Sequence, residues 1–211
     1  PALQSAEKYD TYILKNGYCG AFLMGFALHD EWMQQLKNTT MPTVLLDNFI
    51  ANNPNVAYVG TDSYEGIGLA VRHLNNLGHK KIAFINGSLY SLVSDQRQEA
   101  FESAMRDAGL EIDPDLMGRG YYISETAQYY VPGFLASGAT AIICGSDVIA
   151  KGVIEQCQLK GFKVPDDVSV IGFDDIKLAA APGEQRSRKM CICSSKFTCS
   201  SYSYKPHTAA S

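Results

Sequence analysis

Residues 166–176 read DDVSVIGFDDI, and this stretch decides how the chain is interpreted. Its run of Val, Ile and Phe is typical of a buried strand. The run then stops against two adjacent carboxylates, Asp174 and Asp175. Because carboxylates are costly to bury unless something partners them, we expect a partner or a ligand at the end of this strand.

Strand and helix patterns alternate upstream of this segment, through the first 181 residues. Short apolar strands are predicted at PTVLLD (42–47), KKIAFING (80–87) and TAIICG (140–145), and helical stretches such as SYEGIGLAVRHLNNLG (63–78) separate them. Such alternation, with strands of nearly continuous apolar residues, indicates parallel sheets covered on both faces. The predicted class is therefore α/β.

The number of alternations is high for one sheet, so we predict two doubly wound parallel-sheet lobes. The turn residues of GSLYS (87–91) mark the expected boundary. This divides the chain into an incomplete N-terminal lobe (1–88), a C-terminal lobe (89–181) and a tail (182–211). The tail has seven Ser, three Cys and no helical or strand period, which predicts disorder.

The composition indicates a soluble globular protein. Hydrophobic residues make up 46% and charged residues 19%, and the net charge of −4 offers no basic field for nucleic acid or an anionic membrane. No apolar run approaches membrane-spanning length, and the first ten residues lack a signal-peptide pattern. Cys19, Cys144 and Cys157 lie in apolar settings, which favours a cytoplasmic body over a disulfide framework.

Polar residues follow several of the predicted strands. Ligands of doubly wound sheets bind beyond the carboxyl ends of strands, and the carboxylate of Asp174 can accept hydrogen bonds from two hydroxyls of one ligand. The other strand ends carry Thr61-Asp62-Ser63, Ser94-Asp95-Gln96-Arg97, Tyr121-Tyr122 and Ser146-Asp147.

Structural roles compete with these binding roles. Helix capping explains Asp62, Ser94 and Asp147, since each precedes a helix and Asp62-x-x-Glu65 fits a capping box. A solvated or ion-paired side chain is the alternative for Arg97. The tyrosines are as well explained by packing in the core or on the surface.

The remaining motifs predict neither a cofactor nor a metal. Gly66-x-Gly68 is followed by Val71, where a dinucleotide-binding fingerprint requires Gly or Ala, and there is no phosphate-binding loop. No histidine has metal-ligand spacing. The set of Cys191, Cys193, Cys199 and His207 lacks the paired spacing of zinc sites.

Three long segments resemble the effector-binding domain of the lactose/galactose-repressor (LacI/GalR) family. They are DSYEGIGLAVRHLNNLGHKKIAFING (62–87), SDQRQEAFESAMRDAGLEID (94–113) and TAIICGSDVIAKGVIEQCQLKGFKVPDDVSVIGFDDI (140–176). With MGFALHDEWMQQLKNTTMPTVLLDN (24–48), the resemblance runs unbroken from about residue 7 to 181. The family shares the two-lobe fold of periplasmic sugar-binding proteins.

The resemblance implies a ligand site in the cleft between the lobes. Asp174 matches the family carboxylate that holds ligand hydroxyls, and Arg97 matches its ligand-gripping arginine. Ser146 stands where relatives often carry Asn, and Ser94 begins the SDQR motif that contains Arg97. Tyr122 falls near a position where relatives place an aromatic side chain against the ligand. Such a set suits a sugar or nucleoside-like effector.

The chain departs from the family at both ends. Family members place a DNA-reading helix-turn-helix, a hinge and the first elements of the N-terminal lobe before the point where this sequence begins. After FDDIKLAAA they continue with a strand that returns to the first lobe, whereas this chain reads PGEQRSRKM. A frameshift near Pro182 is one hypothesis for the second departure.

The resemblance therefore implies a regulatory domain rather than an enzyme. Its partners would be a small effector, a second copy through helices 64–77 and 147–160, and DNA only through a helix-turn-helix upstream. The alternative is a periplasmic sugar-binding protein of a transport system. An enzyme of the doubly wound class is a third and more distant interpretation.

Overall fold

The computed structural model describes residues 7–25, 27, 29–176, 190–193 and 197–199 of the 211-residue chain. Its contacts separate two compact units. The first comprises residues 1–61, 90–92 and 197–211, and the second comprises 62–89 and 93–196.

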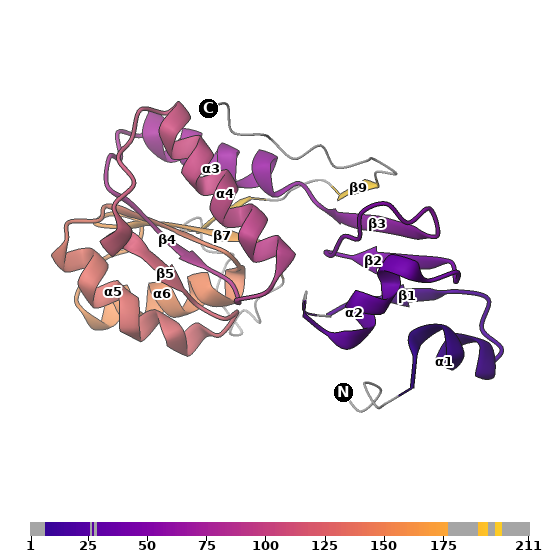
Figure 1. Ribbon diagram of the computed structural model, residues 1–211. Helices are drawn as coiled ribbons and strands as arrows, with labels where there is room; N and C mark the ends of the chain where they lie inside the picture. The colour runs from indigo at the N-terminus through magenta and orange to yellow at the C-terminus, as the bar shows by residue number, and fades with distance from the viewer. Residues whose placement is uncertain (1–6, 26, 28, 177–189, 194–196, 200–211) are drawn as a thin grey trace. The chain divides into compact units, whose positions relative to one another are not determined.

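The second unit is built on a five-stranded sheet with the order β5-β4-β6-β7-β8, in which every strand pair is parallel. Figure 1 shows α3 and α4 on one face of this sheet and α5 and α6 on the other. The strands are β4 (Ile82–Asn86), β5 (Met117–Arg119), β6 (Ala141–Cys144), β7 (Ser169–Phe173) and β8 (Met190–Cys193). The helices are α3 (Ser63–Asn76), α4 (Leu92–Asp107), α5 (Ala127–Ala136) and α6 (Asp147–Leu159), with short 3-10 turns η2 (Pro114–Leu116) and η3 (Ser124–Thr126).

The apolar strands of this sheet supply a core on each face. Because side chains alternate along a strand, Phe84 packs toward α3 and α4, while Ile85 packs toward α5 and α6. Phe84 stacks on Phe101 of α4, with ring centroids 4.8 Å apart. The nearly continuous hydrophobic strands of the sequence are thus explained by helices on both sides.

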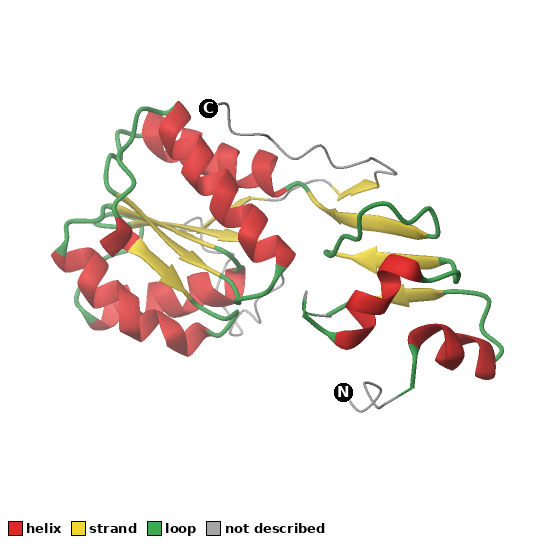
Figure 2. Cartoon of the chain, viewed as in Figure 1, coloured by secondary structure: helices red, strands yellow, loops and turns green. Residues whose placement is uncertain are grey.

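The first unit has a four-stranded sheet with the order β1-β2-β3-β9, in which β9 runs antiparallel to β3. Its strands are β1 (Ala21–Leu23), β2 (Thr43–Leu46), β3 (Val56–Thr61) and β9 (Phe197–Cys199). Figure 2 shows its helices, α1 (Tyr9–Lys15) and α2 (Glu31–Gln35), and η1 (Leu36–Asn38) follows α2.

The described core of the first unit is small. Tyr9 and Ile13 of α1 join Trp32 and Met33 of α2, Leu36 and Leu45 in one buried cluster. Phe22 alternates to the other side of β1, where 55% of its surface is exposed. The described helices therefore bury one side of this sheet.

The predicted fold class is confirmed, but the predicted boundary between residues 88 and 89 is wrong. The second unit begins at Asp62, so it includes α3 and β4. The reason is packing, because Ile67 of α3 and Phe84 of β4 are both fully buried in the core under α4. Within and just after GSLYS, only residues 90–92 return to the first unit.

The prediction of a disordered tail is wrong for two short segments. Residues 190–193 form β8, which pairs with β7, and residues 197–199 form β9, which pairs with β3. Both segments extend an existing sheet edge, where unpaired backbone groups accept another strand whatever its side-chain period. The rest of the predicted tail lies outside the described residues.

Candidate functional site

Three of the five predicted site residues, Tyr122, Ser146 and Asp174, follow the ends of strands of the second sheet, and Ser94 and Arg97 come from α4. Parallel strands bring their carboxyl ends to one edge of a sheet, so residues distant in sequence meet there. Arg97 is only 4% exposed, although a guanidinium almost never leaves water unless it is paired. Its contacts therefore define the site.

The Arg97 side chain is held on three sides. Its Cζ lies 3.9 Å from the centre of the Phe173 ring, Nη1 donates to the backbone oxygen of Gly145, and Nη2 donates to Asp174 Oδ1 at 3.1 Å. Its Nε is buried without a hydrogen-bond partner among the described residues. The resemblance to the LacI/GalR family implied that Arg97 and Asp174 share one ligand site, and the structure brings them together.

Asp174 combines this ion pair with access to solvent. Its side chain is 38% exposed, whereas that of Arg97 is 5% exposed. The chain turns sharply after β7, with φ of 104° at Asp174 and 52° at Asp175, so the strand ends as its first carboxylate is presented. Part of Asp174 thus remains open to a ligand while the arginine beneath orients it.

Asp147 has a different role from the helix cap expected of it. It is the first residue of α6 and fully buried, and its Oδ2 accepts a hydrogen bond from the Ile176 backbone at 2.9 Å. Burial raises the pKa of Asp147 to about 6, and the nearby Asp174 and Asp175 add to this rise. Asp147 therefore ties α6 to the turn that carries Asp174.

The cap of α6 is Ser146. Its hydroxyl oxygen accepts from the backbone nitrogen of Ile149 at 3.3 Å, and the residue is 3% exposed. A hydroxyl can still donate its own hydrogen while it accepts. Of the other two predicted caps, Asp62 accepts from the Glu65 nitrogen at 2.9 Å, which confirms the capping interpretation for α3, whereas Ser94 lies inside α4 and does not precede it.

Ser94 and Tyr122 form a second polar pair. The Ser94 hydroxyl, fully buried at the start of α4, lies 2.9 Å from the Tyr122 hydroxyl. Tyr122 packs beside Gly87, where an added Cβ would lie 2.2 Å from Tyr122 Cζ. Only glycine at the end of β4 leaves room for this tyrosine, so it is Gly87 that permits the pair.

Sequence reasoning missed Asn86, the last residue of β4. Its side-chain oxygen accepts from the Gly87 nitrogen at 2.8 Å, and its Nδ2 donates to the Ser94 backbone oxygen at 2.9 Å. The signal was a single amide at the end of the apolar strand AFIN. Asn86 thereby joins the turn after β4 to the first turn of α4.

No group of three or more His, Cys, Asp or Glu suited to a metal ion occurs among the described residues. The candidate zinc set cannot be placed, since the side chains of Cys191, Cys193 and Cys199 and all of His207 lie outside that description. None of the helices described here has the length and apolar character needed to cross a membrane. The site offers a carboxylate, a guanidinium and hydroxyls, which suit hydrogen bonding to a polar ligand.

Comparisons with known proteins agree with this architecture. A family model for the periplasmic binding protein-like domain matches residues 71–183, just over half of the chain. The HTH-type transcriptional repressor PurR of Pasteurella multocida (strain Pm70) is 34% identical over 167 residues, which cover 78% of this chain and 50% of that protein. The chain thus spans about half the length of the curated relatives it matches.

Two solved structures are similar in fold and sequence. A sugar-binding transcriptional regulator of the LacI family from Escherichia coli, complexed with phosphate, has a TM-score of 0.69 and 28% identity over 79% of this chain and 60% of that one. The transcriptional regulator CelR in complex with cellobiose has a TM-score of 0.70 and 26% identity over 78% of this chain and 51% of that one. The resemblance read from the sequence is therefore confirmed, and the chain belongs to the periplasmic binding protein-like domain family, in the form found in LacI-family transcription regulators.

Proposed function

We propose that this chain is the effector-binding part of a transcription regulator and that it catalyses no reaction. The observation that carries the proposal is the pair of a buried Arg97 and a partly exposed Asp174 at a strand end. Such a pair presents an oriented carboxylate to a small ligand. The relatives named above are transcription regulators, which favours this role over a transport binding protein or an enzyme.

The proposed effector is a small molecule rich in hydroxyl groups, such as a sugar or a nucleoside. Asp174 accepts hydrogen bonds from ligand hydroxyls, Arg97 donates to ligand oxygens, and Ser146 and Ser94 add short hydroxyl contacts. Tyr122 supplies an aromatic face. The cellobiose complex of CelR supports a sugar as the first class to test.

In the proposed mechanism, effector binding changes the affinity of the intact regulator for DNA. An effector can do this only if it binds two arrangements of the protein with unequal affinity. DNA is contacted by a helix-turn-helix of the kind named for the PurR relatives, since a net charge of −4 makes the present chain a poor ligand for phosphates. The site of action is accordingly the cytoplasm.

The intact regulator is proposed to act as a homodimer that uses α3 and α6. Both carry apolar side chains that face water in the single chain: Leu69 of α3 is 44% exposed, and Leu159 of α6 is 75% exposed. Burying such side chains against a second copy would be favourable. Sedimentation of the wild type and of Leu159→Asp tests this proposal, because the variant should sediment as the smaller species.

The effector proposal is tested first by a thermal-shift screen with cellobiose, common monosaccharides and nucleosides, and then by calorimetry with the compound that stabilises most. Asp174→Ala should weaken binding by about 1.5–3 kcal/mol, the range for hydrogen bonds to a charged group, which is roughly 10- to 150-fold. Asp175→Ala is the matched control. Equal affinity of Asp174→Ala and the wild type would remove Asp174 from the site.

A further inference from the structure

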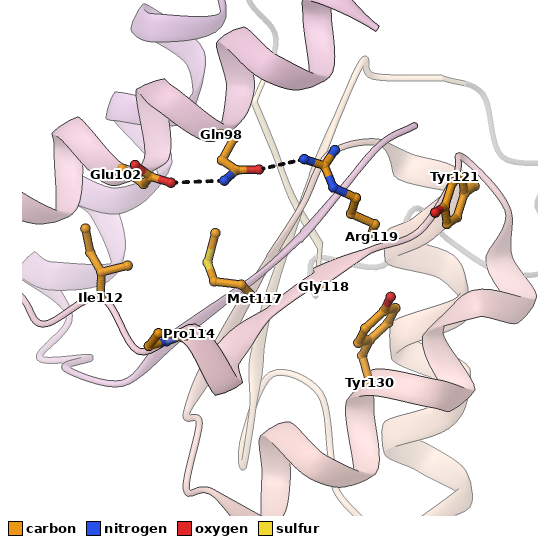
Figure 3. A pocket seen from close by; sticks show the side chains of 9 residues that line it. All are labelled: Gln98, Glu102, Ile112, Pro114, Met117, Gly118, Arg119, Tyr121 and Tyr130. Carbon is orange, nitrogen blue, oxygen red and sulfur yellow. Dashed lines mark hydrogen bonds between the residues drawn. The ribbon is translucent and has the colours of Figure 1, made fainter. Parts of the chain in front are cut away.

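A pocket lies along β5, the outer strand of the second sheet. It has a volume of about 480 Å³ and is lined by side chains of α4, β5 and α5 and the turns beside them. Figure 3 shows Gln98 and Glu102 above it and Tyr130 below it, with β5 passing between them. None of the five proposed effector residues lines this pocket.

One wall of the pocket is a row of polar side chains joined by hydrogen bonds (Figure 3). Arg119 Nη2 donates to Gln98 Oε1 at 3.2 Å, and Gln98 Nε2 donates to Glu102 Oε1 at 3.0 Å. Glu102 also pairs with Arg106 at 3.8 Å, so its charge is already compensated from two sides. The positive charge of Arg119 lacks any comparable ion pair among the described residues.

Donors without acceptors are gathered at the Arg119 end. Arg119 Nη1 is buried with no hydrogen-bond partner in the described part of the chain, and no partner is found there for the hydroxyls of Tyr121 and Tyr130. Figure 3 shows both hydroxyls turned toward the side on which Arg119 lies. Because Arg119 lines the pocket and its positive charge has no carboxylate partner among the described residues, this end of the pocket suits an acceptor with negative charge.

The opposite end of the pocket is apolar. Ile112, Pro114 and Met117 line it, and Tyr130 lies flat against the backbone of Gly118. An added Cβ at Gly118 would come within 2.8 Å of Tyr130 Cδ1, so the glycine lets this ring approach the strand. Apolar walls and a few polar groups placed to fix orientation are typical of small-molecule sites.

We propose that this pocket binds a small organic carboxylate with an apolar body. The carboxylate receives hydrogen bonds from Arg119 and from the hydroxyls of Tyr121 and Tyr130, and the apolar body lies against Met117 and Pro114. This site is additional to the proposed effector site. Asn86 links the two, because it donates to Gln98 Oε1 at 3.4 Å and to the Ser94 backbone oxygen.

The test uses the full chain with sodium benzoate as the probe and benzamide, its neutral analogue, as the matched ligand. Benzoate should bind at least about tenfold more tightly than benzamide by calorimetry, because only the carboxylate pairs with Arg119. It should also shift the side-chain amide signals of Gln98 in nitrogen-15 NMR spectra. Equal binding of the two ligands, or no binding at about 10 mM benzoate, overturns the proposal.

Two variants test whether benzoate binds at Arg119. Arg119→Gln should abolish the preference for benzoate, whereas Arg106→Gln, on an exposed arginine outside the pocket, should keep it. If Arg119→Gln does not fold, the benzoate and benzamide comparison on the wild type still decides the question. Inorganic phosphate should not displace benzoate, and displacement by phosphate would overturn the assignment of a carboxylate with an apolar body.

Discussion

The two sheets of this chain are stabilised in different ways. The second sheet has helices on both faces, and its buried residues form one large cluster on each side. The first sheet has a smaller described cluster around Trp32 and Tyr9, and Phe22 on the other side of β1 is 55% exposed. Deleting a side chain buried under helices costs far more than deleting one that faces water.

This contrast also concerns the proposed site. Asp174, Arg97, Ser146 and Ser94 all belong to the second unit, where each strand end rests on packed side chains. Phe173, for example, is 1% exposed and lies directly under the Arg97 guanidinium. Polar groups that must hold a fixed geometry are best carried by the unit with the denser core.

The largest expected effect is on the stability of the second unit. Phe84→Ala removes a fully buried ring stacked on Phe101 and should lower the free energy of unfolding by about 3–5 kcal/mol. Urea unfolding followed by far-UV circular dichroism measures this loss. Phe22→Ala, on the open side of the first sheet, should change stability by only about 0.5 kcal/mol.

Trp32 allows the unfolding of the first unit to be followed separately. It is the only tryptophan of the chain and is 5% exposed in the first unit, so its fluorescence reports that unit alone. The Phe22→Ala variant should leave the fluorescence-detected urea midpoint nearly unchanged. A loss as large as that of Phe84→Ala would mean that the exposed side of the first sheet is covered in solution.

The next effect is a pH dependence specific to the second unit. The pKa of Asp147 is raised by burial to about 6, from 3.8. Between these values the folded state keeps the Asp147 proton and the unfolded state has lost it, so stability falls as the pH rises from about 4 to 6. The loss is at most about 3 kcal/mol. Comparing circular-dichroism urea midpoints of the wild type and Asp147→Asn across this range tests it, since the variant should lack this dependence.

The first unit should respond to pH in the opposite direction. Burial acts to raise the pKa of Asp10, but hydrogen bonds from Thr39 and Thr40 outweigh it and hold that pKa below 3.8. The unfolded state therefore takes up the proton first, and stability falls as the pH drops below about 4. The fluorescence-detected midpoint should show this fall in the wild type and not in Asp10→Asn. A midpoint that rises on acidification would contradict the assignment.

The smallest expected effect is at the helix caps. Asp62 caps α3 through the Glu65 nitrogen, so Asp62→Ala should cost about 1 kcal/mol in the urea unfolding of the second unit. Lys8, the residue before α1 in the first unit, makes no side-chain cap bond, and Lys8→Ala should have no measurable effect. If Asp62→Ala loses no more stability than Lys8→Ala, the cap contributes little.

Much of the fold follows from local patterns. The apolar runs that end at Asn86, Cys144 and Phe173 became β4, β6 and β7, because side chains that alternate along a strand buried on both faces must all be apolar. The cap at Asp62 followed from a spacing of three residues. The pairing of Arg97 with Asp174 followed from the resemblance to a known family.

Other contacts between distant residues were decided by the tertiary structure alone. The second unit starts at Asp62 because α3 packs under α4, and no local signal at that residue reports it. Asp147 rather than Ser146 reaches the Asp174 turn, and Arg119 lies beside Gln98 only because β5 pairs with β4. The local sequence determines which residues favour burial or a strand. The partner that each residue contacts depends on the order of the strands in the sheet.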